Sequence, residues 1–183
     1  MTPSSDDLSP RWKRLRGFVW DHPAQLDDDA LLARCKRSAD RSTGPGGTRH
    51  DTVRSAVTLE DRDTGLVARA SDRREAARNL SLALRRMRFE LALHVRCGWV
   101  APSDRWRARV RNKQLAINPG HADAPILLAE ALDAIEDRGD VKPAAEALGV
   151  SATQLVRFLA TEPRALAAVN ERRAQQGKRP LRA

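Results

Sequence analysis

The sequence lacks the patterns that mark membrane proteins, secreted proteins and metal-binding modules. No run approaches the about 18–20 apolar residues of a membrane span, and no apolar stretch follows a basic start as in a secretory signal. The chain has two cysteines, Cys35 and Cys97, with no C-x-x-C pair and no histidine at ligand spacing. We therefore expect a cytoplasmic protein with buried, reduced thiols, no metal and no cofactor.

Basic residues outnumber acidic ones, with 33 Lys and Arg against 24 Asp and Glu, a net charge of +9 and a pI near 10.8. Most of the basic residues are arginines, which bind phosphate in bidentate fashion and stack on bases. The balance favours a polyanionic partner such as RNA or DNA. A GC-rich genome, which encodes arginine freely, would produce the same excess, so charge alone does not decide.

Local patterns predict an α+β fold. A short helix over 30–35 should precede the loop at 41–52, and two short strands, 55–59 and 66–70, should form a hairpin around a turn at 61–65. A long helix, capped by Ser71 or Asp72 and running to about Cys97, should place one apolar face on the sheet; its members are Leu80, Leu84, Met87, Leu91 and Val95. We expect a small mixed sheet that is covered by this helix and displays the loop.

The C-terminal part is predicted to be all-α and helix-turn-helix-like. Gly149 fits a left-handed helix stop, and Ser151 fits the N-cap of the next helix. The predicted organisation has four parts: a flexible basic arm at 1–24, an α+β domain at 25–117, a helical module at 121–176 and a basic tail at 177–183. Residues 121–162 hold three basic residues against eight acidic ones. This acidity disfavours binding to duplex DNA.

A glycine-rich loop, Arg41-Ser42-Thr43-Gly44-Pro45-Gly46-Gly47-Thr48, is the most informative segment. Its glycines allow backbone angles closed to other residues, Pro45 stiffens the middle, and exposed amides in such a loop can point at an anionic oxygen. The spacing fits neither a P-loop nor a dinucleotide fingerprint, because no G-K-[ST] or G-x-G-x-x-G pattern is present. Taken alone, the segment is equally compatible with an ordinary surface loop.

With its flanks, the loop resembles a known family. R-S-T-G-P-G-G at 41–47 is followed in register by S-A-V at 55–57, T-G at 64–65, Asp72-Arg73-Arg74 and Asn79. This pattern, over roughly residues 30–97, resembles the catalytic domain of class I peptide chain release factors and of the stand-alone peptidyl-tRNA hydrolases that rescue stalled ribosomes. That family's loop ends in Gly-Gly-Gln and enters the peptidyl transferase centre of the ribosome.

The resemblance implies the roles of the loop residues. Gly46 and Gly47 match the two glycines, and Thr48 stands where the family has glutamine; these three are the candidate catalytic residues, with Ser42, Gly44 and Pro45 as loop support. Further departures are Asp51 and Thr52, in place of Asn-Lys, and Ala76, in place of a glutamine. Candidate RNA-binding residues are Arg41, Arg49, Arg73, Arg74, Arg172, Arg173, Lys178 and Arg179.

The leading hypothesis is a release-factor-like protein that acts in translation termination or ribosome rescue. Its partners would be rRNA and peptidyl-tRNA, with no membrane involved. No codon-reading domain is visible, so its action would be codon-independent. It would hydrolyse the peptidyl-tRNA ester if Thr48 can replace glutamine. The alternatives are a ribosome binder that lost hydrolysis and, with less support, a DNA-binding helix-turn-helix regulator.

Overall fold

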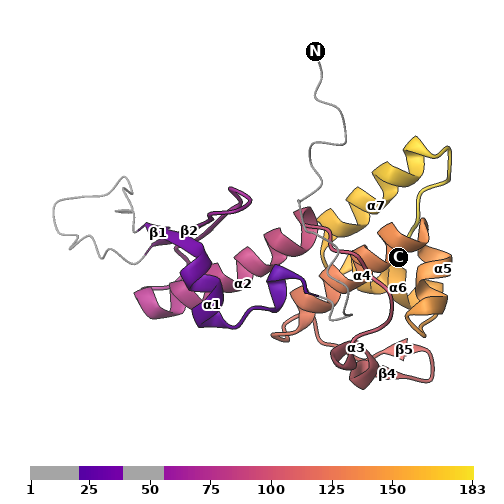
Figure 1. Ribbon diagram of the computed structural model, residues 1–183, viewed down its shortest axis with the longest axis horizontal. Coiled ribbons are helices and arrows are strands. Elements are labelled where there is room, and N and C mark those ends of the chain that lie inside the picture. The colour runs from indigo at the N-terminus through magenta and orange to yellow at the C-terminus, as the bar shows by residue number, and fades with distance from the viewer. Residues whose placement is uncertain (1–20, 39–55) are drawn as a thin grey trace, which may run out of the picture. The chain divides into compact units, whose positions relative to one another are not determined.

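The structure is a computed structural model that describes residues 21–38 and 56–183. These residues form an α+β fold in which seven α-helices accompany a three-stranded and a two-stranded sheet, with a helix-rich C-terminal half (Figure 1). The predicted α+β class and the helical character of the C-terminal half are therefore confirmed. Within the described ranges, none of the helices combines the length and apolar character needed to cross a membrane.

The chain divides into two compact units, and the division falls inside the long helix α2 (Ala76–His94). Residues 23–91 make up the first, which we call the hairpin unit. Residues 92–183, with Asp21 and His22, make up the second, which we call the helical unit. The sequence predicts a boundary at 118–120, and this domain division stays a prediction. Residues 99–110 form hydrogen bonds with the helices that follow them.

Helix α1 (Asp28–Arg34) follows a short 3-10 turn, η2 (Pro23–Gln25), in the hairpin unit. The Asp27 carboxylate caps α1 by accepting a hydrogen bond from the Ala30 amide at 2.8 Å. Such a cap satisfies one of the first-turn amides that lack a partner within the helix. The short helix expected over 30–35 is confirmed, although it begins earlier and ends before Cys35.

The sheet of the hairpin unit has the order β1 (Cys35–Ser38), β2 (Val57–Asp61), β3 (Val67–Ala70). The predicted hairpin is confirmed as β2 and β3, and Leu59 in the central strand pairs with Arg37 on one side and Ala68 on the other. Alternate residues of β2, such as Val57 and Leu59, are buried. This alternation is typical of a strand with one face in a core.

Two features of this sheet differ from the prediction. Both strand pairings are antiparallel, so the expected mixed sheet is wrong for the described strands; the short connection from β2 to β3 can join only antiparallel neighbours. Strand β1 was not predicted, because its four residues show no apolar alternation and only Cys35 is buried. Its extended conformation follows from pairing with β2 rather than from its own side chains.

Helix α2 confirms the predicted apolar face. Leu84, Met87, Leu91 and Val95 are buried, and Leu80 is partly buried. The helix begins at Ala76 rather than at Ser71 or Asp72, because both expected capping residues are engaged differently. The Asp72 carboxylate accepts hydrogen bonds from Arg86 at 2.9 Å, and the Arg86 guanidinium also donates to the Arg69 carbonyl in β3.

The helical unit continues with α3 (Asp104–Arg109) and a two-residue hairpin, β4 (Val110–Arg111) and β5 (Gln114–Leu115). Helix α4 (Ala124–Arg138) is buried from Ala124 to Ile135, and its last three residues are exposed. A helix that is buried on all sides requires partners all round. Helices α5 (Val141–Ala147) and α6 (Ala152–Ala160) supply some of them, and α7 (Pro163–Gln175) packs against α6 (Figure 1).

The turn between α5 and α6 confirms two residue-level predictions. Gly149 has a φ of +73°, in the left-handed region that costs other residues energy. The Ser151 hydroxyl caps α6 by accepting from the Gln154 amide at 3.2 Å. The two helices are thus joined by a tight turn. Their local geometry is the one the sequence predicts at this position.

Residues 99–110 are attached to the helical unit by specific contacts. The buried Trp106 indole donates to the Leu148 carbonyl at 2.8 Å and packs edge-on against Phe158. The buried Glu130 carboxylate of α4 accepts from the amide of Ser103 at 2.6 Å and from its hydroxyl at 2.7 Å. These contacts tie α3 to α4 and α6, so this segment belongs with the helices that follow it.

Candidate functional site

The predicted catalytic loop lies outside the described residues. The residues affected are Arg41, Ser42, Gly44, Pro45, Gly46, Gly47, Thr48 and Arg49. The segments that precede and follow it are described: β1 ends at Ser38, and the buried Ala56 leads into β2. The structure therefore describes the elements on either side of the loop, which we call the scaffold: α1, the three strands and the start of α2.

A buried ion pair holds the scaffold together below the β2–β3 turn. Asp61, at the end of β2, is fully buried, and its two carboxylate oxygens accept hydrogen bonds from Nε and Nη2 of Arg34. Burial alone would raise the pKa of Asp61. The hydrogen bonds from Arg34 and Thr64, with the positive charge of Arg34, outweigh burial and lower that pKa. Asp61 is therefore ionised at neutral pH.

The same carboxylate shapes the Thr64-Gly65 turn, which is one of the motifs behind the family resemblance. The backbone amide of Thr64 donates to Asp61 Oδ2 at 3.0 Å, and the Thr64 hydroxyl donates to the same oxygen. Gly65 has a φ of +72°, and its amide donates to the Asp61 carbonyl at 2.8 Å. Both residues of the motif thus have a conformational role in the turn.

Asn79, in the first turn of α2, fixes the backbone of the segment that precedes the helix. Its side-chain oxygen accepts from the Arg73 amide at 2.9 Å, and its side-chain nitrogen donates to the Arg73 carbonyl at 2.7 Å. Asn79 is fully buried, so both hydrogen bonds are shielded from water. They fix the backbone at Arg73 while the side chains of Arg73 and Arg74 stay exposed.

Several exposed arginines of the hairpin unit lie beyond ion-pair distance of the carboxylates that the structure describes. Arg73 and Arg74 are candidate RNA-binding residues, and no described carboxylate lies within ion-pair distance of either side chain. The same is true of three exposed arginines in or beside the strands, Arg37, Arg62 and Arg69. Within the described part of the chain, an anionic partner would not have to displace a carboxylate from these arginines.

The candidate RNA-binding residues near the C-terminus form ion pairs within the helical unit. Arg172 pairs with Glu136 of α4, while Arg173 and Lys178 both pair with Asp140, the N-cap of α5. The tail is attached as well, because Asn170 exchanges two hydrogen bonds with the backbone of Leu181. Binding of RNA by these residues stays a prediction, and it would have to compete with the ion pairs.

These ion pairs account for part of the acidity of residues 121–162. Glu136 and Asp140 neutralise cations of α7 and the tail, whereas Glu130 and Asp133 are buried. Burial raises the pKa of Glu130 despite its hydrogen bonds from Ser103. On the surface of α6, Arg157 is the basic residue available to a phosphate group. An arrangement with a single basic residue on this helix gives little support for binding to duplex DNA.

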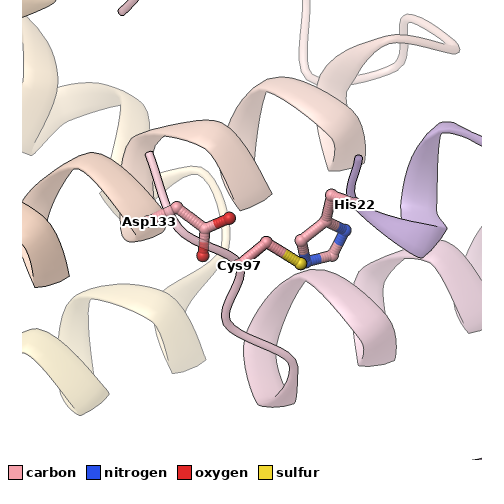
Figure 2. A group of neighbouring side chains, drawn as sticks. All are labelled: His22, Cys97 and Asp133. Atoms are coloured by element: carbon pink, nitrogen blue, oxygen red, sulfur yellow. The ribbon is translucent and has the colours of Figure 1, made fainter. Parts of the chain in front are cut away.

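The helical unit also contains a polar cluster that the sequence did not reveal. His22, Cys97 and Asp133 each place one potential metal-ligand atom within 4.8 Å of the other two (Figure 2). His22 and Asp133 are buried, and Cys97 is partly buried. No local motif could have predicted the group, because its members are 75 and 36 positions apart in the chain.

The Val95 carbonyl and the Arg96 guanidinium, both just after α2, lie next to members of this cluster. His22 Nε2 lies 3.2 Å from the Val95 carbonyl oxygen. The Arg96 guanidinium also donates to that carbonyl and to the carbonyls of Ala92 and Leu93, and it lies 3.8 Å from Asp133 Oδ1. Arg96 thus caps α2 and adds positive charge near the carboxylate.

Comparisons with known proteins return no matching family model, no matching curated protein and no matching solved structure.

Proposed function

We propose that this protein is a release-factor-like, ribosome-associated protein that acts in translation termination or in the rescue of stalled ribosomes. One observation carries the proposal: R-S-T-G-P-G-G, S-A-V, T-G, D-R-R and Asn79 occur in register along residues 41–79. The proposed arrangement is a long helix, α2, that covers the sheet, and a glycine-rich loop displayed between β1 and β2. Residues 1–24 and 177–183 would flank this domain and the helical module as basic arm and tail.

The described residues support the proposal indirectly. Thr64-Gly65 and Asn79 belong to the pattern, and each forms hydrogen bonds that maintain the scaffold on which the loop would stand. The backbone of Arg73 is hydrogen-bonded to Asn79, and the side chains of Arg73 and Arg74 are exposed, beyond ion-pair distance of the described carboxylates. A ribosome presents a dense array of phosphates, for which such arginines are suited.

In the proposed mechanism, the loop enters the peptidyl transferase centre of the ribosome. Gly46 and Gly47 let the backbone approach the ester that joins peptide and tRNA, and the Thr48 amide stabilises the oxyanion formed when water attacks the ester carbonyl. The tRNA 3′ oxygen then leaves with a proton. The Thr48 hydroxyl is shorter than a glutamine amide, so it positions the water less well. If the missing glutamine interaction is worth an oxyanion donor, the rate falls about 10²–10³-fold.

A second candidate function is ribosome binding without hydrolysis. It is favoured by the departures at Thr48, Asp51, Thr52 and Ala76. Ala76 is exposed as the first residue of α2, where the family pattern has a glutamine, so no amide is available at this surface position. A DNA-binding regulator has less support, because the helical module carries few exposed cations on α6.

The test is peptide release from ribosomes stalled on an mRNA that lacks a stop codon. We compare the wild type with Thr48→Gln, and with Thr43→Gln as a matched change elsewhere in the loop. The hydrolase proposal predicts slow release by the wild type and release about 10²–10³-fold faster by Thr48→Gln. Release by Thr48→Gln alone would identify a binder that lost hydrolysis. No release by either protein and no ribosome binding would reject both functions.

A further inference from the structure

The cluster of His22, Cys97 and Asp133 has a donor set that the proposed ribosomal function does not use. An imidazole nitrogen, a thiol sulfur and a carboxylate oxygen meet within 4.8 Å inside the helical unit (Figure 2). Two of the three side chains are buried, where polar groups are costly unless they have specific partners. Such a combination has two principal chemical uses, nucleophilic catalysis and metal binding.

A nucleophilic triad does not fit the hydrogen bonding. In a cysteine triad, one histidine nitrogen faces the thiol and the other donates to the carboxylate. Here the second position is taken, because His22 Nε2 lies 3.2 Å from the Val95 carbonyl and Asp133 lies beside Arg96. The carboxylate is therefore not placed to orient the imidazole as a general base.

The same hydrogen bond suits a metal ligand. A ligating histidine usually donates its other ring N–H to a carbonyl or carboxylate, which fixes the tautomer. With Nε2–H donating to the Val95 carbonyl, the ring proton lies on Nε2, and Nδ1 is the nitrogen that would bind a metal ion. Arg96 holds that carbonyl from the other side and directs its N–H groups at α2. These contacts are typical of the shell around a metal site.

We propose that His22, Cys97 and Asp133 form a site for a divalent transition metal, with Zn²⁺ the best match to the nitrogen, sulfur and oxygen donors. Thiolate and imidazole ligands disfavour Mg²⁺ and Ca²⁺. One thiolate and one carboxylate would offset the two charges of the metal ion, and the Arg96 guanidinium, 3.8 Å from Asp133 Oδ1, would leave one net positive charge at the site. Tetrahedral zinc with bond lengths of about 2.0–2.3 Å requires ligand atoms about 3.4–3.7 Å apart, so binding would draw the three side chains together.

Three protein ligands leave one position of a tetrahedral ion to water or to another group. The site connects residues distant in sequence: His22 from the N-terminal part of the helical unit, Cys97 just after α2 and Asp133 from α4. Metal binding would therefore stabilise the helical unit, because a ligand that binds only the folded state shifts unfolding by mass action.

The experiment uses the full-length protein, reduced and stripped of metal with a chelator. Titration with Co²⁺ is followed by absorption, since a thiolate ligand produces a sulfur-to-cobalt charge-transfer band in the near ultraviolet. Zn²⁺ is then added in competition with a chromophoric chelator. We expect one equivalent of Co²⁺ with a thiolate band, displacement by Zn²⁺, and a higher Tm with Zn²⁺.

Ligand and control variants locate the site. Cys97→Ser should abolish the charge-transfer band, and His22→Gln should weaken metal binding by more than the about 10–100-fold that outer-shell changes cost. Three matched changes away from the cluster, Cys35→Ser, His94→Gln and Asp137→Asn, should leave binding unchanged. Circular dichroism checks folding of each variant. The absence of a thiolate band in the wild type, or a band that persists in Cys97→Ser, would overturn the proposal without reference to ribosomal activity.

Discussion

Two arginine pairs, Arg73-Arg74 in the hairpin unit and Arg172-Arg173 in the helical unit, look alike in the sequence and differ in the structure. The first pair is exposed, and no described carboxylate pairs with it. The second pair binds Glu136 and Asp140 within its own unit. Arginine content thus does not measure the charge that a partner can use, because some arginines serve the fold.

The acidic residues show the same contrast between the units. In the hairpin unit, one buried carboxylate, Asp61, organises α1, the end of β2 and the following turn. In the helical unit, Glu136 and Asp140 pair with cations of α7 and the tail, while α4 is buried from Ala124 to Ile135. We infer that the hairpin unit depends on a specific ionic contact and the helical unit on packing.

The largest expected effect tests this dependence in the hairpin unit. Asp61→Asn removes the buried carboxylate and leaves Arg34 without its main partner, which should lower the free energy of unfolding by about 3–5 kcal/mol. Hydrogen exchange of the amides over residues 57–70 measures the change. Asp63→Asn, at an exposed partner of Arg34, should change stability by no more than about 0.5 kcal/mol. Equal effects of the two changes would contradict the role of Asp61.

A comparable loss in the helical unit should come from apolar packing. Leu127 is fully buried in α4, so Leu127→Ala should reduce the free energy of unfolding by about 2–5 kcal/mol through reduced burial and the cavity that remains. Hydrogen exchange over residues 124–138 would show it. Amides of β2 and β3 provide the reference in the same sample. A loss below about 1 kcal/mol would mean that α4 is less tightly packed than its burial indicates.

A smaller loss of stability is expected at Asp140, where a substitution can release Arg173 from its ion pair and make it resemble Arg73 and Arg74. Asp140→Asn removes the ionic partner of Arg173 and Lys178, and it should lower the free energy of unfolding by about 0.2–1 kcal/mol. The cap of α5 should persist, because asparagine caps helices about as well as aspartate. The released cations should delay elution from a heparin column. Glu146→Gln removes one exposed negative charge of the same unit that lies beyond ion-pair distance of the described cations, and it is the control. Identical elution of the two variants would show that Arg173 and Lys178 do not gain binding capacity.

The smallest expected effect is on the pH dependence of the free energy of unfolding. Two buried carboxyl groups, Asp61 and Glu130, should change it in opposite directions. The pKa of Asp61 is lowered, so its contribution to stability is present above the ordinary aspartate pKa and is lost as the pH falls through the lowered value. The pKa of Glu130 is raised, so its carboxyl favours the folded state at low pH and that advantage is lost as the pH rises through the raised value.

Chemical denaturation of Asp61→Asn and Glu130→Gln across the acidic range, each compared with the wild type, tests this prediction. The stability deficit of Asp61→Asn should shrink as the pH falls. The deficit of Glu130→Gln should instead shrink as the pH rises. The wild type loses stability when the Glu130 carboxyl ionises, whereas the variant has no carboxyl to ionise at this position. Parallel curves for the two variants would contradict the opposite signs.

Sequence predicted those parts of the fold whose signals are local. The β2–β3 hairpin, the apolar face of α2, and the Gly149 and Ser151 turn each depend on residues within a few positions. Strand β1 and the late start of α2 were missed, because pairing with β2 and the hydrogen bonds of Asn79 and Asp72 determine them. The hydrogen bond from the Trp106 indole to the carbonyl of Leu148, 42 positions away, could not be predicted either, because no local pattern marks it.

The candidate site shows the same limit. The loop residues could be proposed from the sequence, because the family pattern is linear. The His22, Cys97 and Asp133 cluster could not, since folding alone brings its members together. The ion pairs of Arg172 and Arg173 were hidden for the same reason: their partners lie in α4 and before α5.

The most direct measurement for the central claim is salt-dependent co-sedimentation with ribosomes, with duplex DNA as competitor. We compare Arg73→Ala/Arg74→Ala with Arg172→Ala/Arg173→Ala. If the protein docks on the ribosome through the hairpin unit, the first variant binds more weakly, and its salt dependence falls by about one counterion for each arginine–phosphate interaction removed. The second variant should bind nearly as the wild type does. Equal binding by both variants, or displacement of ribosomes by duplex DNA, would contradict the account.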